Sequence, residues 1–461
     1  MKKTVFLFLI CCLMAGCAKA ESIADTEKSE ESEGQESLET REQYESSTEA
    51  EEGEWTEFPF PYKEELKKVE DEAGQETVYF TLKEAMEDYD IMWQQLEENC
   101  AYLSMAEETL GIDLEETKRI GKTFFIPQRS KGNTFLLQGF EKAISYALTD
   151  INNYGHISVM EAEFYEELLE NITSGGEDAK EGWDGVRCRI KELLSNQKTK
   201  EFYDYEESRR SEGTGGTLVV ENDKTVKTDK IDGIAYIKIP KCDPEQIDAI
   251  KDFLKENEHE KNIIIDIRGN SGGSTLTWTE GIVSPLIKEE VTYNSLWGIK
   301  SGKLNEYYWR QEIPDYVESN VTLSKEELKE KFPYLKIEDD IQYVWYKTTI
   351  EPGEEHYDFE GKIWLLVDKT VYSASDAFVI FCKNTGFATV VGTITGGNGE
   401  GGEPHYIVLP NSGMVIRYEP YLTFNSDGSC NAVHGGYPDI EIAEDEDALE
   451  VCLKAIAESE N

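Results

Sequence analysis

Several common signatures of enzyme chemistry are missing from this 461-residue sequence. No Cys-x-x-Cys pair occurs, and that pair is the usual spacing of zinc and thioredoxin-like sites. Neither glycine-rich run, 269–273 or 396–402, ends in Gly-Lys-Ser/Thr, so a phosphate-binding loop is not indicated. We therefore predict neither a metal site nor a cofactor.

Positive charge is scarce. The chain has 46 basic residues against 94 acidic ones, which gives a formal net charge of −48. A chain of this charge repels phosphate backbones, so we predict no nucleic-acid partner. Peptides carrying positive charge would instead be attracted to it, and a cationic peptide or protein is a candidate ligand.

The apolar run from Val5 to Met14 follows two lysines and is too short to remain as a membrane-spanning helix. Residues 1–16 therefore predict a signal peptide. Met14-Ala15-Gly16-Cys17 resembles a bacterial lipobox, which implies cleavage before Cys17, lipid attachment there, and a place on the extracytoplasmic face of a bacterial cell membrane. An ordinary signal peptide is the alternative. Residues 17–54, rich in Glu, Ser and Thr, predict a disordered acidic tether.

The hydrophobic pattern beyond residue 54 divides the chain further. Helical spacing predicts an N-terminal helical bundle that begins with a Thr81–Glu84 capping box. Alternating strand and helix patterns predict an α/β core, interrupted by an aromatic-rich insertion. The insertion fits either a cap over a peptide groove or a satellite core. The predicted segments are the bundle at 55–160, linking helices and a hairpin around Asn222-Asp223 at 161–232, the core at 233–445, the insertion at 289–360, and a C-terminal helix at 446–461.

The stretch from Lys362 to Gly386 predicts a buried strand, a turn and a helix. Ser373 then lies at the first turn of the helix, beside backbone N–H groups that have no partner within the helix. Those groups and the helix dipole stabilise a developing oxyanion, so an acyl-transfer nucleophile fits there. A simpler interpretation is that Ser373 or Ser375 only caps the helix.

A second loop with glycines follows another buried strand, 262–266. In Asp266–Gly273 the glycine pair allows the backbone N–H groups to approach a ligand closely, as an oxyanion hole requires. An ordinary strand-to-helix turn is the alternative.

Taken together, four stretches in this order resemble the C-terminal processing protease and tricorn-core family of serine peptidases, in its histidine-using branch without a PDZ domain. The resemblance covers most of 233–440 and implies a crotonase-like α/β core and hydrolysis through an acyl-enzyme. The four stretches are Asp266–Gly273, Ser373–Asp376, Val390–Thr393 and Gly436–Ile440.

The resemblance also implies roles for particular residues. Ser373 matches the nucleophile, and the oxyanion hole matches the N–H groups of Ala374 and of Gly272 or Gly273. One branch of the family takes a lysine as base from a Gly-Lys-Gly, but this chain has Asn398 there, and an amide cannot accept the serine proton.

The other branch takes a histidine that follows the helical bundle, and His156 matches that place. Its ordinary pKa near neutrality suits a general base. No third residue is fixed by the sequence, so a Ser–His dyad is possible. Weaker alternatives are Asp150, Ser158 and Glu400 as the residue that orients the imidazole, and His434 as a second-choice base.

The sequence therefore predicts an exported, lipid-anchored serine endopeptidase that cleaves peptides or proteins. Asn398 in place of the lysine motivates an alternative, a non-catalytic peptide-binding lipoprotein on a degenerate peptidase fold. A crotonase-like core also suggests an acyl-CoA enzyme, although export argues against one.

Overall fold

The structure, a computed structural model, describes residues 66–70, 76–125, 134–174, 182–211, 225–309, 323–333, 335–399, 404–443 and 445–460. Every described residue belongs to one compact unit, Pro59–Asn461. The predicted signal peptide, Cys17 and the acidic tether lie outside the described residues. Within the described ranges, none of the helices has the length and apolar character needed to cross a membrane.

A six-stranded sheet in the order β15-β11-β10-β7-β6-β5 forms the α/β core. Its strands run parallel except β5, which pairs antiparallel with β6. The two apolar runs of the sequence form the neighbours β7 and β10, and the predicted α/β fold is confirmed. The strands are β5 (Lys227–Ile231), β6 (Ile234–Lys238), β7 (Asn262–Asp266), β10 (Lys362–Val367), β11 (Thr389–Gly392) and β15 (Ile440–Glu441).

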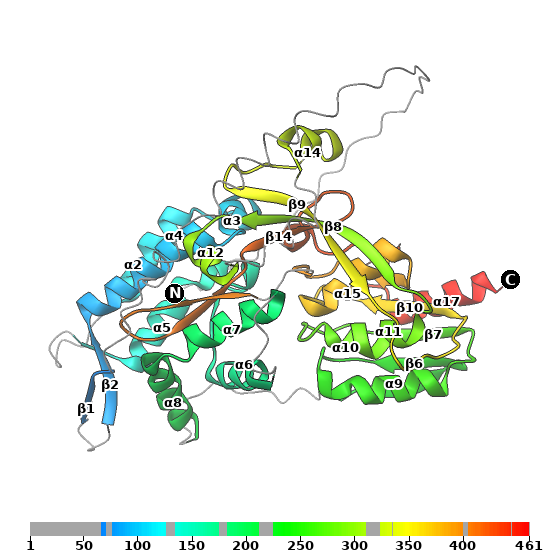
Figure 1. The fold of residues 1–461 in the computed structure, drawn as a ribbon, viewed down its shortest axis with the longest axis horizontal. Helices are drawn as coiled ribbons and strands as arrows, with labels where there is room; N and C mark the ends of the chain where they lie inside the picture. Colours follow the sequence, from blue (N-terminus) through cyan, green and yellow to red (C-terminus); the bar gives the residue numbers. More distant parts are fainter. Residues whose placement is uncertain are drawn as a thin grey trace, which may run out of the picture. The chain divides into compact units, whose positions relative to one another are not determined.

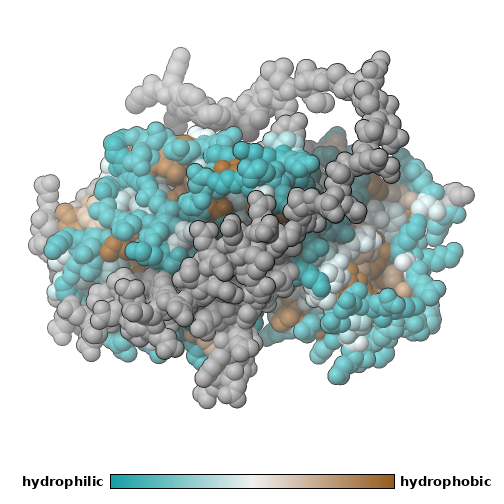
Figure 2. Space-filling model, turned by 45° about the horizontal axis from the view of Figure 1, so that its top comes forward, coloured by the Kyte–Doolittle hydropathy of each residue, from teal (hydrophilic) through white to brown (hydrophobic). Residues whose placement is uncertain are grey.

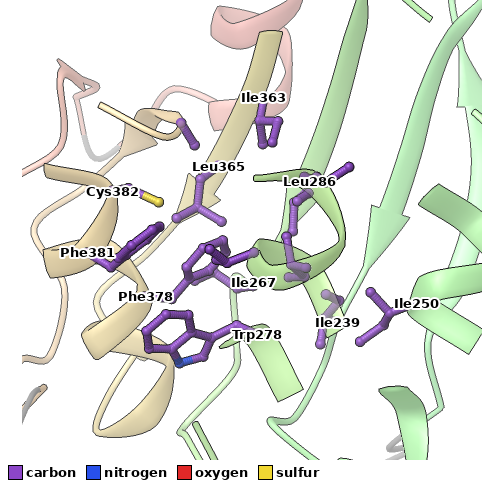
Figure 3. Close-up of a cluster of buried hydrophobic side chains, with 14 of the residues drawn as sticks. Ile239, Ile250, Ile267, Trp278, Leu286, Ile363, Leu365, Phe378, Phe381 and Cys382 are labelled. Carbon is purple, nitrogen blue, oxygen red and sulfur yellow. The ribbon is translucent and has the colours of Figure 1, made fainter. Parts of the chain in front are cut away.

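Helices cover both faces of this sheet, because alternate side chains of a strand point to opposite faces. Ile263 and Leu365 pack with α9 (Ile247–Glu256), α10 (Leu276–Trp278) and α15 (Ala374–Thr385). Figure 3 shows Trp278, Phe378 and Leu365 facing one another in this cluster. On the opposite face, Ile264 and Trp364 pack against α17 (Ala448–Ser459). Figure 1 labels these helices and colours them by their position in the sequence.

The N-terminal region contains several helices and a small sheet, β1-β2-β3, that the sequence did not reveal. Thr81 and Glu84 form both bonds of the capping box at the start of α2. The region contains β1 (Lys68–Glu70), β2 (Glu76–Thr81), α2 (Leu82–Asn99), α3 (Leu103–Leu110), α4 (Leu114–Gly121), β3 (Thr134–Leu136), α5 (Leu137–Ala147), the 3₁₀ turn η5 (Tyr154–His156) and β4 (Ser158–Val159). Three more helices follow, α6 (Ala162–Ser174), α7 (Gly182–Leu194) and α8 (Gln197–Ser211).

The turn predicted at Asn222-Asp223 lies outside the described residues, and the structure describes another hairpin further along the chain. Residues 227–231 pair with 234–238, so the turn lies at Asp232-Gly233, where both residues have positive φ. The first predicted strand, 217–221, lies outside the described residues.

The described part of the insertion contacts both the core and the N-terminal helices. Tyr293 of β8 contacts the ring of Phe381 in α15 with centroids 5.7 Å apart. At the other end, the Leu304 N–H in α12 donates to Asn99 Oδ1 of α2 at 3.0 Å. The insertion therefore joins the sheet region to the N-terminal helices. It consists of β8 (Val291–Lys300), α12 (Lys303–Trp309), α14 (Lys325–Lys331) and β9 (Ile341–Ile350), and β8 also pairs with β14 (Tyr421–Phe424).

The face of the molecule shown in Figure 2 is mostly hydrophilic over the described residues, as the charge predicts. Cys100, Cys242, Cys382, Cys430 and Cys452 are buried free thiols. No group of three or more His, Cys, Asp and Glu side chains suited to a metal ion occurs in the described part of the chain.

Candidate active site

Two loops meet at the carboxyl ends of two central strands of the sheet. β7 and β10 are adjacent and parallel, with Leu366 opposite Asp266, so the loops that leave their carboxyl ends emerge side by side. The Tyr372 N–H donates to Asn270 O at 3.3 Å. A Cβ on Gly272 would lie 2.9 Å from Ser373 Cβ. The glycine loop and the predicted nucleophile are therefore in direct contact.

Ser373 is the N-cap residue of α15, but its side chain does not cap the helix. Its φ of 56° is unusual for a residue with a side chain, and its hydroxyl makes no capping hydrogen bond. The Oγ atom lies 3.2 Å from His156 Nε2. Ser375 instead holds the two loops together, because its Oγ donates to Asn270 O at 2.7 Å. The helix-cap interpretation of Ser373 is therefore wrong.

His156 is brought to Ser373 by a strand pairing between distant parts of the chain. It ends η5, and the next strand, β4, pairs antiparallel with β13 (Val415–Tyr418) so that Ser158 is opposite Arg417. Continuing this register beyond both strands, two residues before Ser158 and two after Arg417, brings His156 opposite Glu419. His156 Nδ1 lies 3.1 Å from Glu419 Oε2, so the imidazole has a hydroxyl on one side and a carboxylate on the other.

Glu419 is the residue that sequence reasoning missed. Among the weaker alternatives, Asp150 accepts a hydrogen bond from a threonine of α4, and the Ser158 hydroxyl donates to the backbone oxygen of His156, not to its ring. The ring of His434 makes no hydrogen bond to any residue that the structure describes, and Glu400 lies outside the described residues.

A signal for Glu419 was nevertheless present. It is the only acidic residue between Pro404 and Ser426, and it falls between two apolar stretches that form β13 and β14. A single carboxylate between two buried strands requires a partner, because an unpaired buried charge is costly.

Burial sets the protonation of the pair. The side chains of His156 and Glu419 are 9% and 1% exposed. If Glu419 is ionised, its carboxylate can only accept hydrogen bonds; Nδ1 then carries the proton and donates to Glu419, which leaves Nε2 to accept from the Ser373 hydroxyl. Burial, followed by the nearby charge of Arg417, holds the pKa of His156 well below its ordinary value of 6.5. The imidazole is therefore neutral at neutral pH and able to accept a proton.

Asn398 also contacts the imidazole. It has a φ of 58°, and its carboxamide nitrogen lies within hydrogen-bonding distance of His156 Nδ1. The loop that carries it is fixed by the buried carboxylate of Asp376, which accepts hydrogen bonds from the Thr395 hydroxyl and from the Gly399 N–H. Burial raises the pKa of Asp376 to about 6.

Two backbone N–H groups beside Ser373 remain available to a ligand. The Gly272 N–H already donates to Asn270 Oδ1 at 2.9 Å. Among the described residues, the N–H groups of Gly273 and Ala374 have no hydrogen-bond partner. A Cβ on Gly273 would lie 2.0 Å from Cys242 O, so only glycine fits. The structure thus separates the two glycines that the sequence left as alternatives.

Backbone strain is concentrated here. The described residues other than glycine with positive φ are Asn153, His156, Asp232, Ser373 and Asn398. Of these only Asp232 lies elsewhere, in the β5–β6 hairpin; Asn153 O accepts a hydrogen bond from the Tyr372 hydroxyl at 2.9 Å. Strain persists only where the surrounding structure enforces it, and it clusters at functional sites.

Trp278 supports this arrangement from the core side. Its ring stacks on Phe378 with centroids 5.3 Å apart, and its Nε1–H donates to Ala374 O at 2.8 Å.

We expect Trp278→Ala to lower the free energy of unfolding by about 3–5 kcal/mol, the usual cost of such a cavity. Trp278→Phe keeps an aromatic ring and should cost less than half as much. Urea titration measures both values; equal losses for the two variants would contradict the packing role.

Residues 233–442 match the family model described as peptidase family S41, whereas no curated protein matches the chain. Among solved structures, the chain is similar to a candidate peptidase from Parabacteroides merdae (15% identity, 82% of this chain and 96% of that chain, TM-score 0.47). It is also similar to mature CPAF (12%, 78% and 92%, TM-score 0.45) and to the photosystem II D1 C-terminal processing protease (13%, 79% and 93%, TM-score 0.36).

Proposed function

The chain carries a domain of peptidase family S41, a family of serine peptidases, over residues 233–442, and from this premise we propose that it is an endopeptidase with Ser373 as nucleophile and His156 as general base. The observation that carries the proposal is the hydrogen-bonded line from Ser373 Oγ through the His156 ring to Glu419, with distances of 3.2 and 3.1 Å. A nucleophile, a base and a group that orients the base are the parts that acyl transfer requires.

The steps of peptide hydrolysis follow from this row of hydrogen-bonded side chains. As Ser373 Oγ attacks the peptide carbonyl carbon, its proton moves to His156 Nε2, and Glu419 stabilises the imidazolium that forms. The same proton then passes to the leaving amine, the peptide C–N bond breaks, and an acyl-enzyme remains on Ser373. His156 next deprotonates a water molecule, which attacks the ester carbon and releases the second product with the serine restored.

The N–H groups of Ala374 and Gly273 would form the oxyanion hole. Both are without a partner in the described part of the chain, and Ala374 begins a 12-residue helix whose dipole favours negative charge at that end. Gly272, the other glycine of the pair, would shape the loop through its N–H bond to Asn270. Donors fixed before the reaction stabilise the tetrahedral intermediate without reorganisation.

Asn398 would help Glu419 to orient the imidazole. Because Nδ1–H donates to Glu419, the amide atom that faces Nδ1 must be an acceptor, and a half-turn of the carboxamide places Oδ1 there. Asn398 is then a positioning residue, not a base. Its place in the glycine-rich loop corresponds to that of the lysine in the other branch of the resembled family.

The cellular location of the protein is proposed from the sequence alone. The lipobox-like Met14–Cys17 supports cleavage before Cys17, lipid attachment there and anchoring on the extracytoplasmic face of a bacterial membrane. The net charge of −48 supports cationic peptides or proteins as substrates, because opposite charge speeds encounter. Globomycin, which blocks lipoprotein signal peptidase, should cause the unprocessed precursor to accumulate; unchanged processing would count against anchoring through Cys17.

Internally quenched peptide pools test the proposed reaction. Purified protein should cleave such pools with multiple turnovers, and His156→Ala should reduce the rate by several orders of magnitude because serine then lacks its base. Peptide binding without any turnover would support the alternative of a non-catalytic binding protein and would overturn the peptidase proposal.

The pH dependence of hydrolysis should reflect the low pKa of His156. A base with a depressed pKa stays neutral as the pH falls, so kcat/KM should keep its plateau from neutral pH down to 6.5 and decline only below that. The profile is measured with a peptide that has no titratable group. An acid limb centred at or above 6.5 would contradict the assignment of a buried, neutral imidazole as the base.

A further inference from the structure

Arg417 is an unusual cation in this acidic chain. The side chain is half-buried, with its guanidinium carbon 4.7 Å from the centroid of the Phe164 ring. Its Nε atom is buried and makes no hydrogen bond, and no carboxylate pairs with it among the described residues. By contrast, Arg268 pairs with Asp266 at 2.7 Å.

In the sequence and in the strand register, Arg417 is a near neighbour of His156 and Glu419. Arg417 is opposite Ser158, two residues after His156, and it precedes Glu419 by two residues along β13. Its charge acts on both His156 and Tyr372, and the ring centroids of these two residues lie 5.3 Å apart. Arg417 thus lies on β13, the strand whose pairing with β4 positions the imidazole.

An unpaired cation at this point carries a cost. A positive charge next to a general base opposes formation of the imidazolium, and the buried Nε has lost hydration that no hydrogen bond in the described chain replaces. Both costs fall if an anion arrives with the substrate. Guanidinium groups bind carboxylates with two parallel N–H bonds, and this guanidinium packs against the ring of Phe164.

We propose that Arg417 binds a carboxylate of the peptide substrate next to the scissile bond. The carboxylate comes either from an Asp or Glu side chain or from the C-terminus of the peptide. This inference rests on the proposed peptidase function and names part of its substrate class. It also separates two effects of charge: the whole chain attracts cationic peptides over long range, whereas Arg417 selects for one negative group at the site.

Four matched, internally quenched peptide pools test the inference. Two contain Asp or Glu at each scanned position and two contain Asn or Gln there, and each kind is made with a free or an amidated C-terminus. We expect the kcat/KM of the wild-type protein to be about 10- to 100-fold higher for one kind of carboxylate-bearing pool than for its uncharged counterpart, as expected for a charged hydrogen-bonded pair. The favoured pool identifies the source of the carboxylate, a side chain or the C-terminus.

Substitutions at Arg417 should remove the preference itself. Arg417→Gln should reduce the ratio of the two rates to about one, and Arg417→Lys should leave an intermediate ratio because it loses the forked geometry. Arg119→Gln removes the same charge from an exposed ion pair on α4 and should keep the wild-type ratio. A ratio is insensitive to the fraction of folded protein in each preparation.

Direct binding keeps the inference testable without catalysis. Fluorescence polarisation with Ser373→Ala protein should show tighter binding of the favoured pool than of its amide counterpart, with the difference absent in Ser373→Ala/Arg417→Gln. Cleavage without any carboxylate preference, or a preference that survives Arg417→Gln, would overturn the inference and leave the peptidase proposal standing. Carboxylate-selective binding without cleavage would do the reverse.

Discussion

Ser373→Ala should abolish peptide hydrolysis, with kcat falling by about 10⁶-fold, as is typical when a serine nucleophile is removed. The reason is local: Ser373 Oγ is the hydroxyl that contacts His156 Nε2, at 3.2 Å. Among the described residues, the hydroxyl of the neighbouring Ser375 bonds to backbone atoms alone, Asn270 O and Tyr372 O and N. Initial rates on quenched peptides, with the protein checked for folding by circular dichroism, measure the effect.

Ser375→Ala is the matched control for this experiment. It removes a hydroxyl two residues away and leaves the Ser373–His156 pair in place. We expect a loss of about 1–2 kcal/mol in the free energy of unfolding, from the lost buried hydrogen bonds, and hydrolysis within about ten-fold of wild type per folded molecule. If Ser375→Ala were inactive while Ser373→Ala retained hydrolysis, the nucleophile would have been assigned to the wrong serine.

Glu419→Gln should lower kcat by about 10⁴-fold with little change in folding, the size of the effect known when the acid of a triad becomes an amide. A glutamine can present its NH₂ group to Nδ1, which moves the imidazole proton to Nε2. The nitrogen that faces Ser373 would then donate a proton instead of accepting one. Steady-state kinetics over a range of pH measure the loss, and a higher pH should not restore the rate because the fault is in the tautomer.

Asp150→Asn is the informative control, since Asp150 was a candidate for the same role. Its carboxylate bonds to a threonine of α4 and not to the imidazole, so its kcat should stay within about two-fold of wild type. A large loss in Asp150→Asn together with full activity in Glu419→Gln would reject Glu419 as the orienting residue.

Local patterns in the sequence predicted the elements that hold Ser373. The apolar strands 262–266 and 363–367 and the helix that follows Ser373 were each recognisable from a few neighbouring residues. The glycine loop and the turn before the helix follow the same strands. These features depend on interactions between residues close in sequence, which is why composition and spacing were sufficient.

Glu419 and Arg417 depend instead on long-range pairing. Their positions follow from the antiparallel register of β4 with β13, which joins segments far apart in the chain. No local pattern encodes that register. The choice between Gly272 and Gly273 likewise required the Asn270 side chain, which takes up one N–H group and leaves the other.

The insertion shows the same limit. Its aromatic residues suited either a cap or a packed core, because burial alone does not reveal which surface an aromatic ring covers. The contact of Tyr293 with Phe381 and the bond from Leu304 to Asn99 show what the described part packs against. These contacts also connect the region that carries His156 to the region that carries Ser373.

Mass-spectrometric mapping of a fluorophosphonate adduct tests the central claim, activation of Ser373 by His156, most directly. The reagent reacts with activated serines, so folded wild-type protein should carry one adduct, on the peptide that contains Ser373, and His156→Ala should react at least a thousand-fold more slowly. An adduct on another serine, no adduct on folded wild-type protein, or equal rates in the two proteins would contradict the account.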